Sequence, residues 1–433
     1  MKNVRIGAVA ILASAALALT ACGGGGSSTP GTTETTGGGG GDQAVTLDWG
    51  FWNQGDEGNK MWQGLADSVT EAYPNITVKL TSPPFADYFT KLQSQLASNS
   101  APCIVSMQSL RLPAFAQAME PIDELMAAQG FKADEWNPAA LRALQFDGKQ
   151  YALPYGLSTM AFFYNKDAFK QAGLEEPQPG WTIKDFEDAA VKITAATGKP
   201  AFGQSFSDLH MFSQLLAYNG AKPVGEDGRL QLTNDTMKAA FTWYSGLATE
   251  KHVSLVPASS SDVPWGEQQF VAGNVSMAVD GTWNLVSTAK DATFPVGVTT
   301  LPVGEGGISS FSANSGFGIS KSCEHKEEAA KAIAVITGAK GQETAAAAGT
   351  RPARIASDDT FYKGIAELDQ KIPGFSEQAR KAMDMSSQTA IPFIPTSNWD
   401  AVTKSIAREF ILAYTGSATP VQALENVQAS TGK

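Results

Sequence analysis

The sequence contains few of the residues that most often catalyse reactions or bind metals. It has only three cysteines and three histidines in 433 residues. No G-x-S-x-G, H-E-x-x-H, C-x-x-C or Walker A motif occurs. One S-x-x-K match at Ser287–Lys290 lacks its partner motifs, so chance explains it. We therefore predict that the chain is not an enzyme and needs neither a metal nor another cofactor.

Basic residues and long apolar runs are also scarce. The chain has 32 Lys and Arg against 43 Asp and Glu, which gives a formal net charge of −11. Nucleic-acid binding needs clustered positive charge, so the composition argues against a nucleic-acid partner. Only the N-terminal region has a long apolar run, and the rest of the chain is expected to be soluble.

That N-terminal region has the pattern of a secretion signal. The run Ile6–Thr20 follows two positive charges and is too short for a comfortable membrane span. It ends in Leu19-Thr20-Ala21-Cys22, which resembles a lipoprotein signal. The resemblance implies that residues 1–21 are removed and that Cys22 is diacylated, and two acyl chains anchor a protein stably. A plain signal peptide with an incidental cysteine is the alternative.

The segment after the signal is rich in Gly, Ser and Thr. Residues 22–43 cannot bury a core and are expected to form a flexible tether. This arrangement predicts a protein anchored by lipid on the extracytoplasmic face of the cell membrane. Cys103 and Cys323 remain in the folded part, either as a disulfide or as two buried thiols, and their spacing does not decide between these.

From residue 44 onward, strand and helix patterns alternate. Thr182 is placed to cap a helix with Asp185 three residues on, and Trp181 and Phe186 are placed as a hydrophobic staple. The alternation predicts an α/β fold with mostly parallel sheets covered by helices. Strands are expected at 45–49, 76–80 and 104–107, and helices at 59–73, 86–98, 237–248 and 327–337.

The stretch YALPYGLSTMAFFYNKDAF, Tyr151–Phe169, is apolar on both sides of a break. Pro154 and Gly156 lie inside it, and a single sheet strand tolerates neither residue well. The break indicates that the stretch is not one continuous strand but two apolar segments on either side of Pro154-Tyr155-Gly156.

Eight segments, in this order, resemble the extracellular solute-binding proteins of carbohydrate ABC importers, in the maltose-binding protein superfamily. The resemblance covers nearly all of residues 44–433 and implies a two-lobed periplasmic-binding-protein type II fold with the ligand in the cleft between the lobes. One departure is Cys103, where the family commonly has Asp. The segments are AYPNITVKL, DYFTKLQSQLASNSAP, FDGKQYALPYG with FFYNKDAFKQAGL, PGWTIKDFEDAAVKIT, FVAGNVSMAVDGTW, PVGVTTLPVGEGG, SGFGISKSCEHKEEAAKAIAVIT and IPFIPTSNWDAV.

The resemblance also implies that both lobes are discontinuous in sequence. The N-terminal lobe is expected to comprise residues 44–155 and 313–365, and the C-terminal lobe residues 156–312 and 366–433. The chain is expected to cross between them near Pro154–Ser158, near Phe311–Ser315 and around residues 360–375.

A sugar presents apolar ring faces and a rim of hydroxyls, so its site needs aromatic platforms and polar side chains. By the resemblance, Trp283 and Trp399 match stacking positions, with a buried structural role as the alternative for each. Glu57 replaces a basic residue of maltose-binding protein, so maltose itself is not implied. The polar contacts are expected to be Asp56, Glu57, Arg111 and Asp208, and the further candidates are Trp52, Asn53, Gln108, Tyr155, His210 and Trp265.

Several of these candidates also have a structural interpretation. Asp56 and Glu57 could form a solvated loop that caps a helix. Tyr155 could pack the crossing segment, His210 could be a hydrogen-bonded structural histidine, and Trp265 could pack the helix that it begins.

Together these features predict a monomer that captures a small carbohydrate ligand and delivers it to the permease subunits of an ABC transporter. A binding protein for another solute, such as a polyamine, a peptide or a metal chelate, is the first alternative. A secreted glycoside hydrolase is the second, because such enzymes also combine aromatic residues with paired carboxylates.

Overall fold

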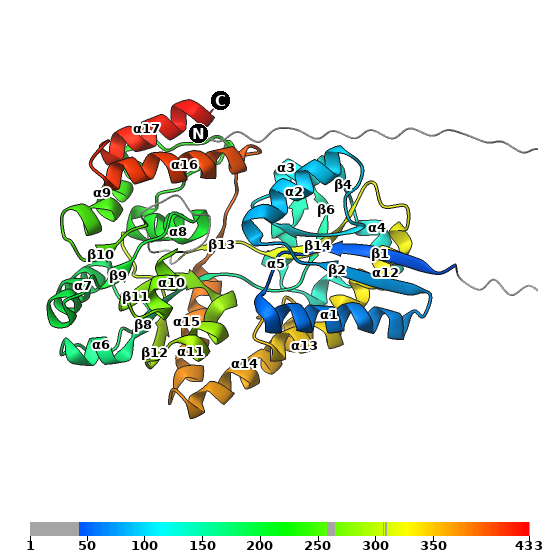
Figure 1. Ribbon diagram of the computed structural model, residues 1–433, viewed down its shortest axis with the longest axis horizontal. Helices are drawn as coiled ribbons and strands as arrows, with labels where there is room; N and C mark the ends of the chain where they lie inside the picture. The colour runs from blue at the N-terminus through cyan, green and yellow to red at the C-terminus, as the bar shows by residue number, and fades with distance from the viewer. Residues whose placement is uncertain (1–42, 258–264, 306, 308–309, 433) are drawn as a thin grey trace, which may run out of the picture. The chain divides into compact units, whose positions relative to one another are not determined.

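The computed structural model describes residues 43–432 except 258–264, 306 and 308–309. Cys22, the signal and nearly all of the tether lie outside the described residues. The described chain contains two main sheets, each flanked by helices (Figure 1). Within this part of the chain, no helix combines the length and the apolar character needed to cross a bilayer.

The first sheet is built mostly from the N-terminal part of the chain. Its strand order is β2-β1-β3-β14-β4, with β7 also paired to β14. The β1–β2 and β1–β3 pairs are parallel, whereas β14 is antiparallel to β3, β4 and β7. The strands are β1 (Val45–Gly50), β2 (Ile76–Thr81), β3 (Ile104–Gln108), β4 (Met119–Glu120), β7 (Ala152–Pro154) and β14 (Ser315–Ser320).

The second sheet has the order β10-β9-β11-β8-β12. Here β9 is parallel to β10 and β11, and β8 is antiparallel to β11 and β12. The expected α/β fold is therefore present, but both sheets are mixed where mostly parallel sheets were expected. The strands are β8 (Met160–Asn165), β9 (Phe202–Gly203), β10 (Ser254–Leu255), β11 (Met277–Gly281) and β12 (Val296–Thr299).

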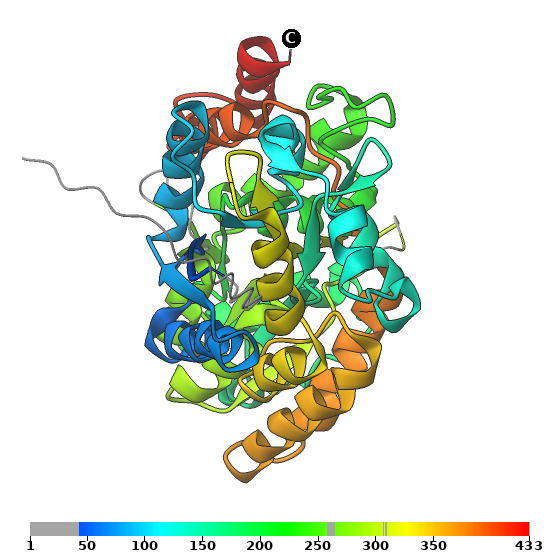
Figure 2. The same cartoon turned by 90° about the vertical axis from the view of Figure 1, so that its right-hand side faces the viewer.

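Helices pack against both sheets, and α12 and α13 lie beside α1 (Figures 1 and 2). The helices associated with the first sheet are α1 (Gly55–Ala72), α2 (Phe85–Ala97), α3 (Leu112–Phe115), α4 (Asp123–Ala128), α5 (Pro138–Ala143), α12 (Lys326–Ile336) and α13 (Ala339–Ala347). Those associated with the second are α6 (Lys166–Gln171), α7 (Ile183–Thr197), α8 (Asp208–Asn219), α9 (Asp235–Thr249), α10 (Trp265–Val271), α11 (Leu285–Asp291), α14 (Asp358–Ala366), α15 (Phe375–Thr389), α16 (Trp399–Tyr414) and α17 (Pro420–Thr431). Two short pairs, β5 (Gln145–Phe146) with β6 (Lys149–Gln150) and β13 (Phe311–Ser312) with β15 (Ile391–Pro392), complete the pairing.

Local sequence signals account for several element boundaries. Strand β1 alternates buried and exposed residues over most of its length, as a strand with one solvated face should. The capping box of α7 is present, with the Thr182 and Asp185 side chains bonded reciprocally to each other's backbone N–H. Its staple is also confirmed, because the rings of Trp181 and Phe186 meet edge to face at 5.9 Å between centroids. Helix α1 begins at Gly55, four residues before the expected start.

The interrupted stretch passes from one sheet to the other, as expected. Strand β7 ends at Pro154 in the first sheet, and β8 begins at Met160 in the second. The two faces of β8 serve different cores, since Phe162 packs on the side of α7 and α8 whereas Phe163 packs on the side of α14 and α15.

The third crossing of the chain involves α14. Phe361 and Ile365 of this helix are fully buried in the same core as Phe163 of β8. Helix α14 packs on α15 but also closely on α13, which lies beside α1, so its contacts reach both sides and the crossing expected at residues 360–375 stays a prediction. The lobe boundaries themselves stay a prediction.

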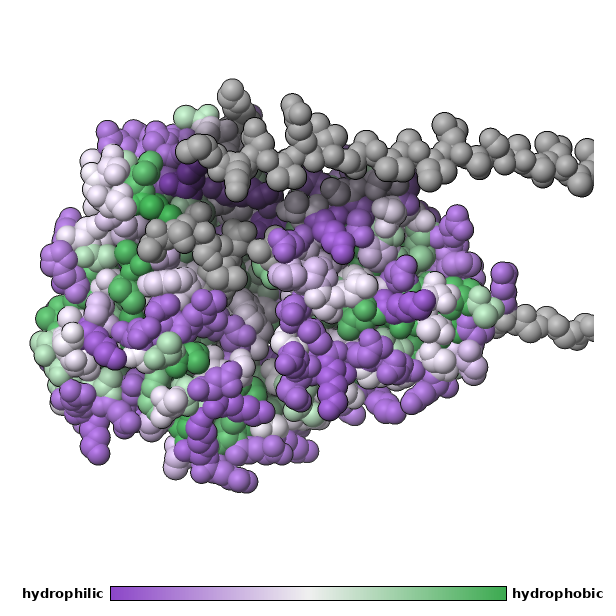
Figure 3. All heavy atoms as spheres, viewed as in Figure 1, coloured by the Kyte–Doolittle hydropathy of each residue, from purple (hydrophilic) through white to green (hydrophobic). Residues whose placement is uncertain are grey.

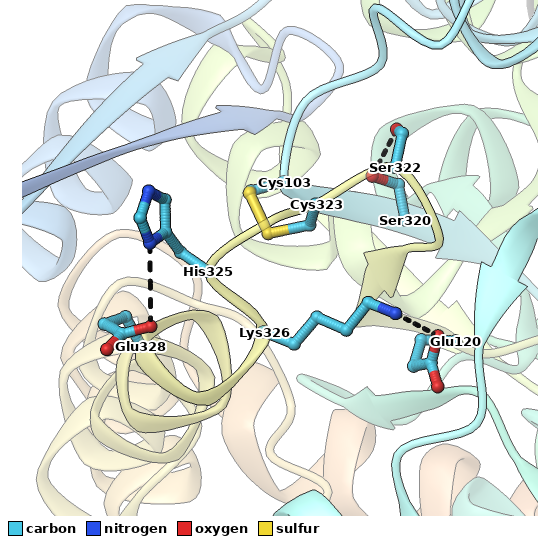
Figure 4. The surroundings of a disulfide bond; sticks show 8 residues. All are labelled: Cys103, Glu120, Ser320, Ser322, Cys323, His325, Lys326 and Glu328. Atoms are coloured by element: carbon cyan, nitrogen blue, oxygen red, sulfur yellow. Dashed lines mark hydrogen bonds and ion pairs between the residues drawn. A yellow bond between two sulfur atoms is a disulfide. The ribbon is translucent and has the colours of Figure 1, made fainter.

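Cys103 and Cys323 form a disulfide, which answers the question that the sequence left open. The bridge joins the residue before β3 to the turn after β14, with the Cα atoms 4.6 Å apart (Figure 4). Lys326 and Glu120 form an ion pair of 2.7 Å close to it. The bridge therefore links the parallel and antiparallel parts of the first sheet.

Candidate ligand-binding site

A cavity of about 1830 Å³ lies between the two sheets and is lined by residues associated with each. It exceeds the ~300–1,000 Å³ of a typical small-molecule pocket, so it has room for a ligand of several rings. Much of the wall comes from segments that follow the carboxyl ends of strands, where α/β proteins usually bind ligands. The predicted contacts on this wall are Trp52, Asn53, Asp56, Glu57, Gln108, Arg111, Tyr155, Asp208, His210 and Trp283.

The loop after β1 provides one polar corner of the cavity. Asn53 Oδ1 accepts hydrogen bonds from the backbone N–H of Gly55 at 2.7 Å and from Asn59 Nδ2 at 3.1 Å. These bonds order the loop, and Asp56 and Glu57 follow in the first turn of α1, where negative charge also suits the helix dipole. The N-cap residue of α1 is Gln54 and no side chain caps the helix by a hydrogen bond, so Asp56 and Glu57 do not act as caps, and their contact with a ligand stays a prediction.

Trp52 and Tyr155 are packed more tightly than free platforms would be. Trp52 is 6% exposed and contacts the rings of Phe85 and Tyr88. Tyr155 stacks on Phe317 with the ring centroids 5.0 Å apart, and burial raises the pKa of its hydroxyl. Both residues border the cavity, but each one's main contacts are with the first core, so the hinge-packing interpretation of Tyr155 is favoured.

Arg111 and Asp208 approach each other across the cavity. The Nη1 atom of Arg111, which follows β3, lies 4.0 Å from Oδ2 of Asp208, which begins α8. Both side chains are only 13% exposed, and the guanidinium lies over the ring of Phe89 at 5.7 Å. Nε and Nη1 of Arg111 are buried and have no hydrogen-bond partner in the described chain, so the guanidinium keeps unused hydrogen-bonding capacity beside the cavity.

Trp283 is the open aromatic surface of the site. It follows β11, lines the cavity and is 41% exposed, whereas most large apolar side chains of the described chain are buried. A Cβ atom at Gly281 would lie 2.2 Å from the indole, so the missing side chain of Gly281 lets the ring rest on the backbone. The His210 ring meets the indole edge to face at 6.0 Å between centroids. Trp283 is therefore held in place while part of its ring faces the cavity.

Trp399 does not line the cavity, so its predicted role as a second stacking platform is corrected. Its side chain is 1% exposed and packs against Phe212 and Phe393 in the second core. Its indole Nε1 donates a 2.8 Å hydrogen bond to Oδ2 of Asp208. Trp399 therefore holds the carboxylate of Asp208, which lines the cavity, from the side of the second core. Trp265, at the start of α10, is also not among the residues that line the cavity.

Sequence reasoning missed two acidic residues near His210. Asp280 is the penultimate residue of β11, before Gly281, and is fully buried, and its Oδ1 lies 3.1 Å from His210 Nε2. Glu267, in the first turn of α10, lines the cavity, and burial followed by the charge of Asp280 raises its pKa to about 9. His210, Glu267 and Asp280 lie in different parts of the sequence. Only Asp280 was part of a motif that drew attention, Asp280-Gly281-Thr282-Trp283.

The described residues give no sign of a metal site. They contain no group of three or more His, Cys, Asp or Glu side chains arranged to hold a metal ion. The chemistry available on the cavity wall is therefore hydrogen bonding, ion pairing and aromatic contact.

The chain forms two sheets that are flanked by helices and joined by crossing segments. A large cavity lined by polar and aromatic residues lies between them. This arrangement defines a two-lobed solute-binding protein. The family model described as "Bacterial extracellular solute-binding protein" matches residues 53–343, and the chain belongs to this family.

Individual relatives are distant in sequence but close in fold. The arabinooligosaccharide-binding protein of Bacillus subtilis is 24% identical over 48% of this chain, which spans about half of that protein's length. An ABC substrate-binding protein from Listeria monocytogenes, solved with cycloalternan, aligns with a TM-score of 0.77 and 24% identity over 89% of this chain and 97% of its own. The Mycobacterium tuberculosis protein UgpB, solved with glycerophosphocholine, aligns with a TM-score of 0.75 and 21% identity over 89% and 97%. These structures share the two-lobed fold.

Proposed function

We propose that this protein is the solute-binding component of an ABC importer and captures a sugar or oligosaccharide between its two lobes. The observation that carries the proposal is the half-exposed Trp283, set in a cavity of about 1830 Å³ with polar groups on both sides. An aromatic face bordered by hydrogen-bonding groups complements the apolar face and polar rim of a sugar ring. Relatives named for arabinooligosaccharide and cycloalternan binding support the same ligand class.

We expect the ligand to be captured by closure of the two lobes, because residues associated with both sheets line the cavity. Gln108 ends strand β3 of the first sheet and Arg111 follows it, whereas Asp208 and Trp283 belong with the second sheet. A ligand that contacts all four gains free energy only when the two sides approach, which favours a closed form. The crossing segments around Tyr155 are suited to act as the hinge.

We also propose the cellular setting that the sequence predicts. Cys22 would carry the lipid anchor, and the monomer would face outward from the cell membrane and present its closed form to the permease subunits. Metabolic labelling with a palmitate analogue tests the anchor. Label on the wild-type chain and none on Cys22→Ser is expected, and equal labelling would contradict it.

Calorimetric titration with two ligand panels tests the ligand class. Neutral oligosaccharides should release or absorb heat with a saturable isotherm, and linear polyamines should not. Saturable binding of an amine alone would favour a polyamine-binding protein, since Asp56, Glu57 and Asp208 place three carboxylates on the cavity wall and carboxylates with aromatic walls suit cations.

We also propose that the protein binds oligosaccharides without hydrolysing them. Incubation of the protein with each oligosaccharide that binds, followed by chromatography, should return the oligosaccharide intact. Shortened products that disappear with Glu267→Gln or Asp208→Asn would instead indicate a glycoside hydrolase, whose reaction needs two such carboxyl groups.

Trp283→Ala should weaken carbohydrate binding by about 1–2 kcal/mol, or roughly 5- to 30-fold, because it removes the aromatic platform. Trp283→Phe keeps a ring and should lose much less, about threefold or under. The thermal midpoint should stay close to wild type for both variants, since the side chain is 41% exposed. Unchanged affinity of Trp283→Ala in calorimetric titration would remove this residue from the site.

A further inference from the structure

Three side chains on the second-sheet side of the cavity carry buried polar atoms that have no hydrogen-bond partner in the described chain. The atoms are Glu267 Oε2, His210 Nδ1 and Asp280 Oδ2. The His210 side chain is 3% exposed and that of Asp280 is 0% exposed, while Glu267 and His210 line the cavity. A buried polar atom without a partner costs free energy, so a ligand that supplies the partner gains affinity.

The backbone brings Glu267 to this place through a close approach of two glycines. A Cβ atom at Gly266 would lie 2.3 Å from the carbonyl oxygen of Gly203, and one at Gly203 would lie 2.7 Å from that of Gly266. Helix α10 can therefore begin directly against β9, and it also packs against β11. Glu267 is the next residue after Gly266, and this packing sets it beside the end of β11, where Asp280 lies.

The other polar contacts of Asp280 are fixed. Its Oδ1 atom lies 3.1 Å from His210 Nε2 and accepts a 2.6 Å hydrogen bond from the backbone N–H of Gly281. Among the described residues, no lysine or arginine forms an ion pair with Asp280 or Glu267, and Arg111 of the cavity wall pairs with Asp208. Two ionised carboxylates buried together without a compensating cation are unfavourable, so one of them holds a proton.

Glu267 is the carboxyl that holds it. Burial, and then the negative charge of Asp280, raises the pKa of Glu267 to about 9. Of the described elements that pack most closely on α10, β11 contributes Asp280 and β9 (Phe202–Gly203) contributes no titratable group. Asp280 in turn contacts His210. The other charged groups considered on this part of the cavity wall are the ion-paired Arg111 and Asp208.

We propose that Glu267 determines ligand specificity at this site: its uncharged carboxyl donates a hydrogen bond to a hydroxyl of a neutral ligand, beside the unpartnered Nδ1 atom of His210. A sugar hydroxyl both accepts and donates, so it satisfies the Glu267 hydroxyl and one neighbouring acceptor together. A cationic amine offers only donors, so it would have to displace the Glu267 proton to bind. The inference rests on the proposed carbohydrate ligand and adds a preference for neutral polyhydroxyl compounds.

The protonation of Glu267 is tested on the unliganded protein by infrared difference spectroscopy. At about pH 7 the wild type minus Glu267→Gln spectrum should show the carbonyl band of a protonated carboxyl, which disappears as the pH is raised past about 9. Glu327→Gln, at an exposed position in α12, is the control and should leave that band in place. Absence of a band specific to Glu267 would overturn the proposal.

The stability of the unliganded protein gives a second readout with a defined sign. The pKa of Glu267 is raised from its ordinary value of 4.5 to about 9 in the folded chain, by burial and then by the charge of Asp280. Stability from this group is therefore fully present below about pH 4.5 and is lost as the pH rises toward 9. In urea titrations the wild type should weaken relative to Glu267→Gln across this interval. Parallel pH profiles of the two proteins would contradict the proposal.

The ligand contact is tested by calorimetric titration with maltotriose and arabinotriose as neutral probes and spermidine as the cationic probe. For a neutral probe that binds, affinity should fall about tenfold between pH 7 and pH 10, because only about a tenth of the protein then carries the Glu267 proton. Glu267→Gln should bind with little pH dependence, and Glu267→Ala should bind about tenfold more weakly at pH 7.

The outcomes separate this inference from the proposed function. Binding of a neutral probe with equal affinity at both pH values, or unchanged by Glu267→Ala, overturns the inference and leaves carbohydrate capture standing. Binding of spermidine alone, with proton release measured in two buffers of different ionisation enthalpy, overturns both. Binding of a neutral probe with the expected alkaline loss supports both.

Discussion

Replacing Trp399 by alanine is expected to destabilise the protein by about 3–5 kcal/mol while the cavity wall keeps its aromatic platform. The side chain is 1% exposed and fills space between Phe212 and Phe393, so its removal leaves a void in the second core. Chemical denaturation monitored by circular dichroism measures the loss. A stacking residue on the cavity wall would behave differently, with a loss of affinity and little loss of stability.

Trp399→Phe separates packing from hydrogen bonding. Phenylalanine keeps most of the buried ring but lacks the indole N–H that donates to Asp208. The expected loss is smaller than for alanine, and carbohydrate affinity should fall modestly because Asp208 is less well held. A full loss of affinity in Trp399→Phe with unchanged stability would mean that Trp399 contacts the ligand directly, which would contradict its assignment to the core.

Replacing Cys103 and Cys323 together by alanine is expected to cost about 2–5 kcal/mol of stability. The bridge closes a loop with a sequence separation of 220, and a cross-link over a long loop removes the most conformational entropy from the unfolded chain. Wild type treated with reductant should approach the double variant in denaturant midpoint, and reductant should leave the double variant unchanged. Equal midpoints for oxidised wild type and the double variant would show that the bridge adds no stability.

Ligand affinity should change little in the same variant when it is folded. The disulfide lies before β3 and after β14, at the ends of these strands opposite to Gln108 and Ser315, which line the cavity. Calorimetric titration should therefore give an affinity within about threefold of wild type, and a larger loss would show that the bridge shapes the site.

The sequence predicted the elements that depend on local chemistry. The capping box of α7 and the change of sheet at Pro154 each involve neighbouring residues, whose preferences act within a few positions. The antiparallel pairing of β14 with β3 and β7 in the first sheet could not be predicted in this way. It depends on the return of the chain from the second sheet, far from the strands that it joins.

The two tryptophans show where site prediction reached its limit. Trp283 and Trp399 have similar neighbours in sequence, rich in Gly, Asn and Asp. The difference lies in tertiary packing, since Trp283 rests on Gly281 whereas Trp399 enters a core. A signal for the core was nevertheless present, because Trp399, Val402, Ile406 and Phe410 recur at helical spacing and form the buried stripe of α16.

The carboxyl pair had no comparable signal. Glu267 and Asp280 meet only because α10 packs against β9 at Gly203 and Gly266, and no spacing in the sequence encodes that approach. Perturbed carboxyl groups in cavities often mark functional positions, which is how the structure draws attention to Glu267.

Small-angle X-ray scattering of the protein, with and without a saturating oligosaccharide, tests the central claim most directly. If a carbohydrate is captured by closure of two lobes, the radius of gyration should fall when an oligosaccharide that binds in calorimetry is added, and at the same concentration it should fall less for Trp283→Ala, in proportion to the lower occupancy of that variant. Saturation by the oligosaccharide with no fall in the radius of gyration would contradict capture by closure.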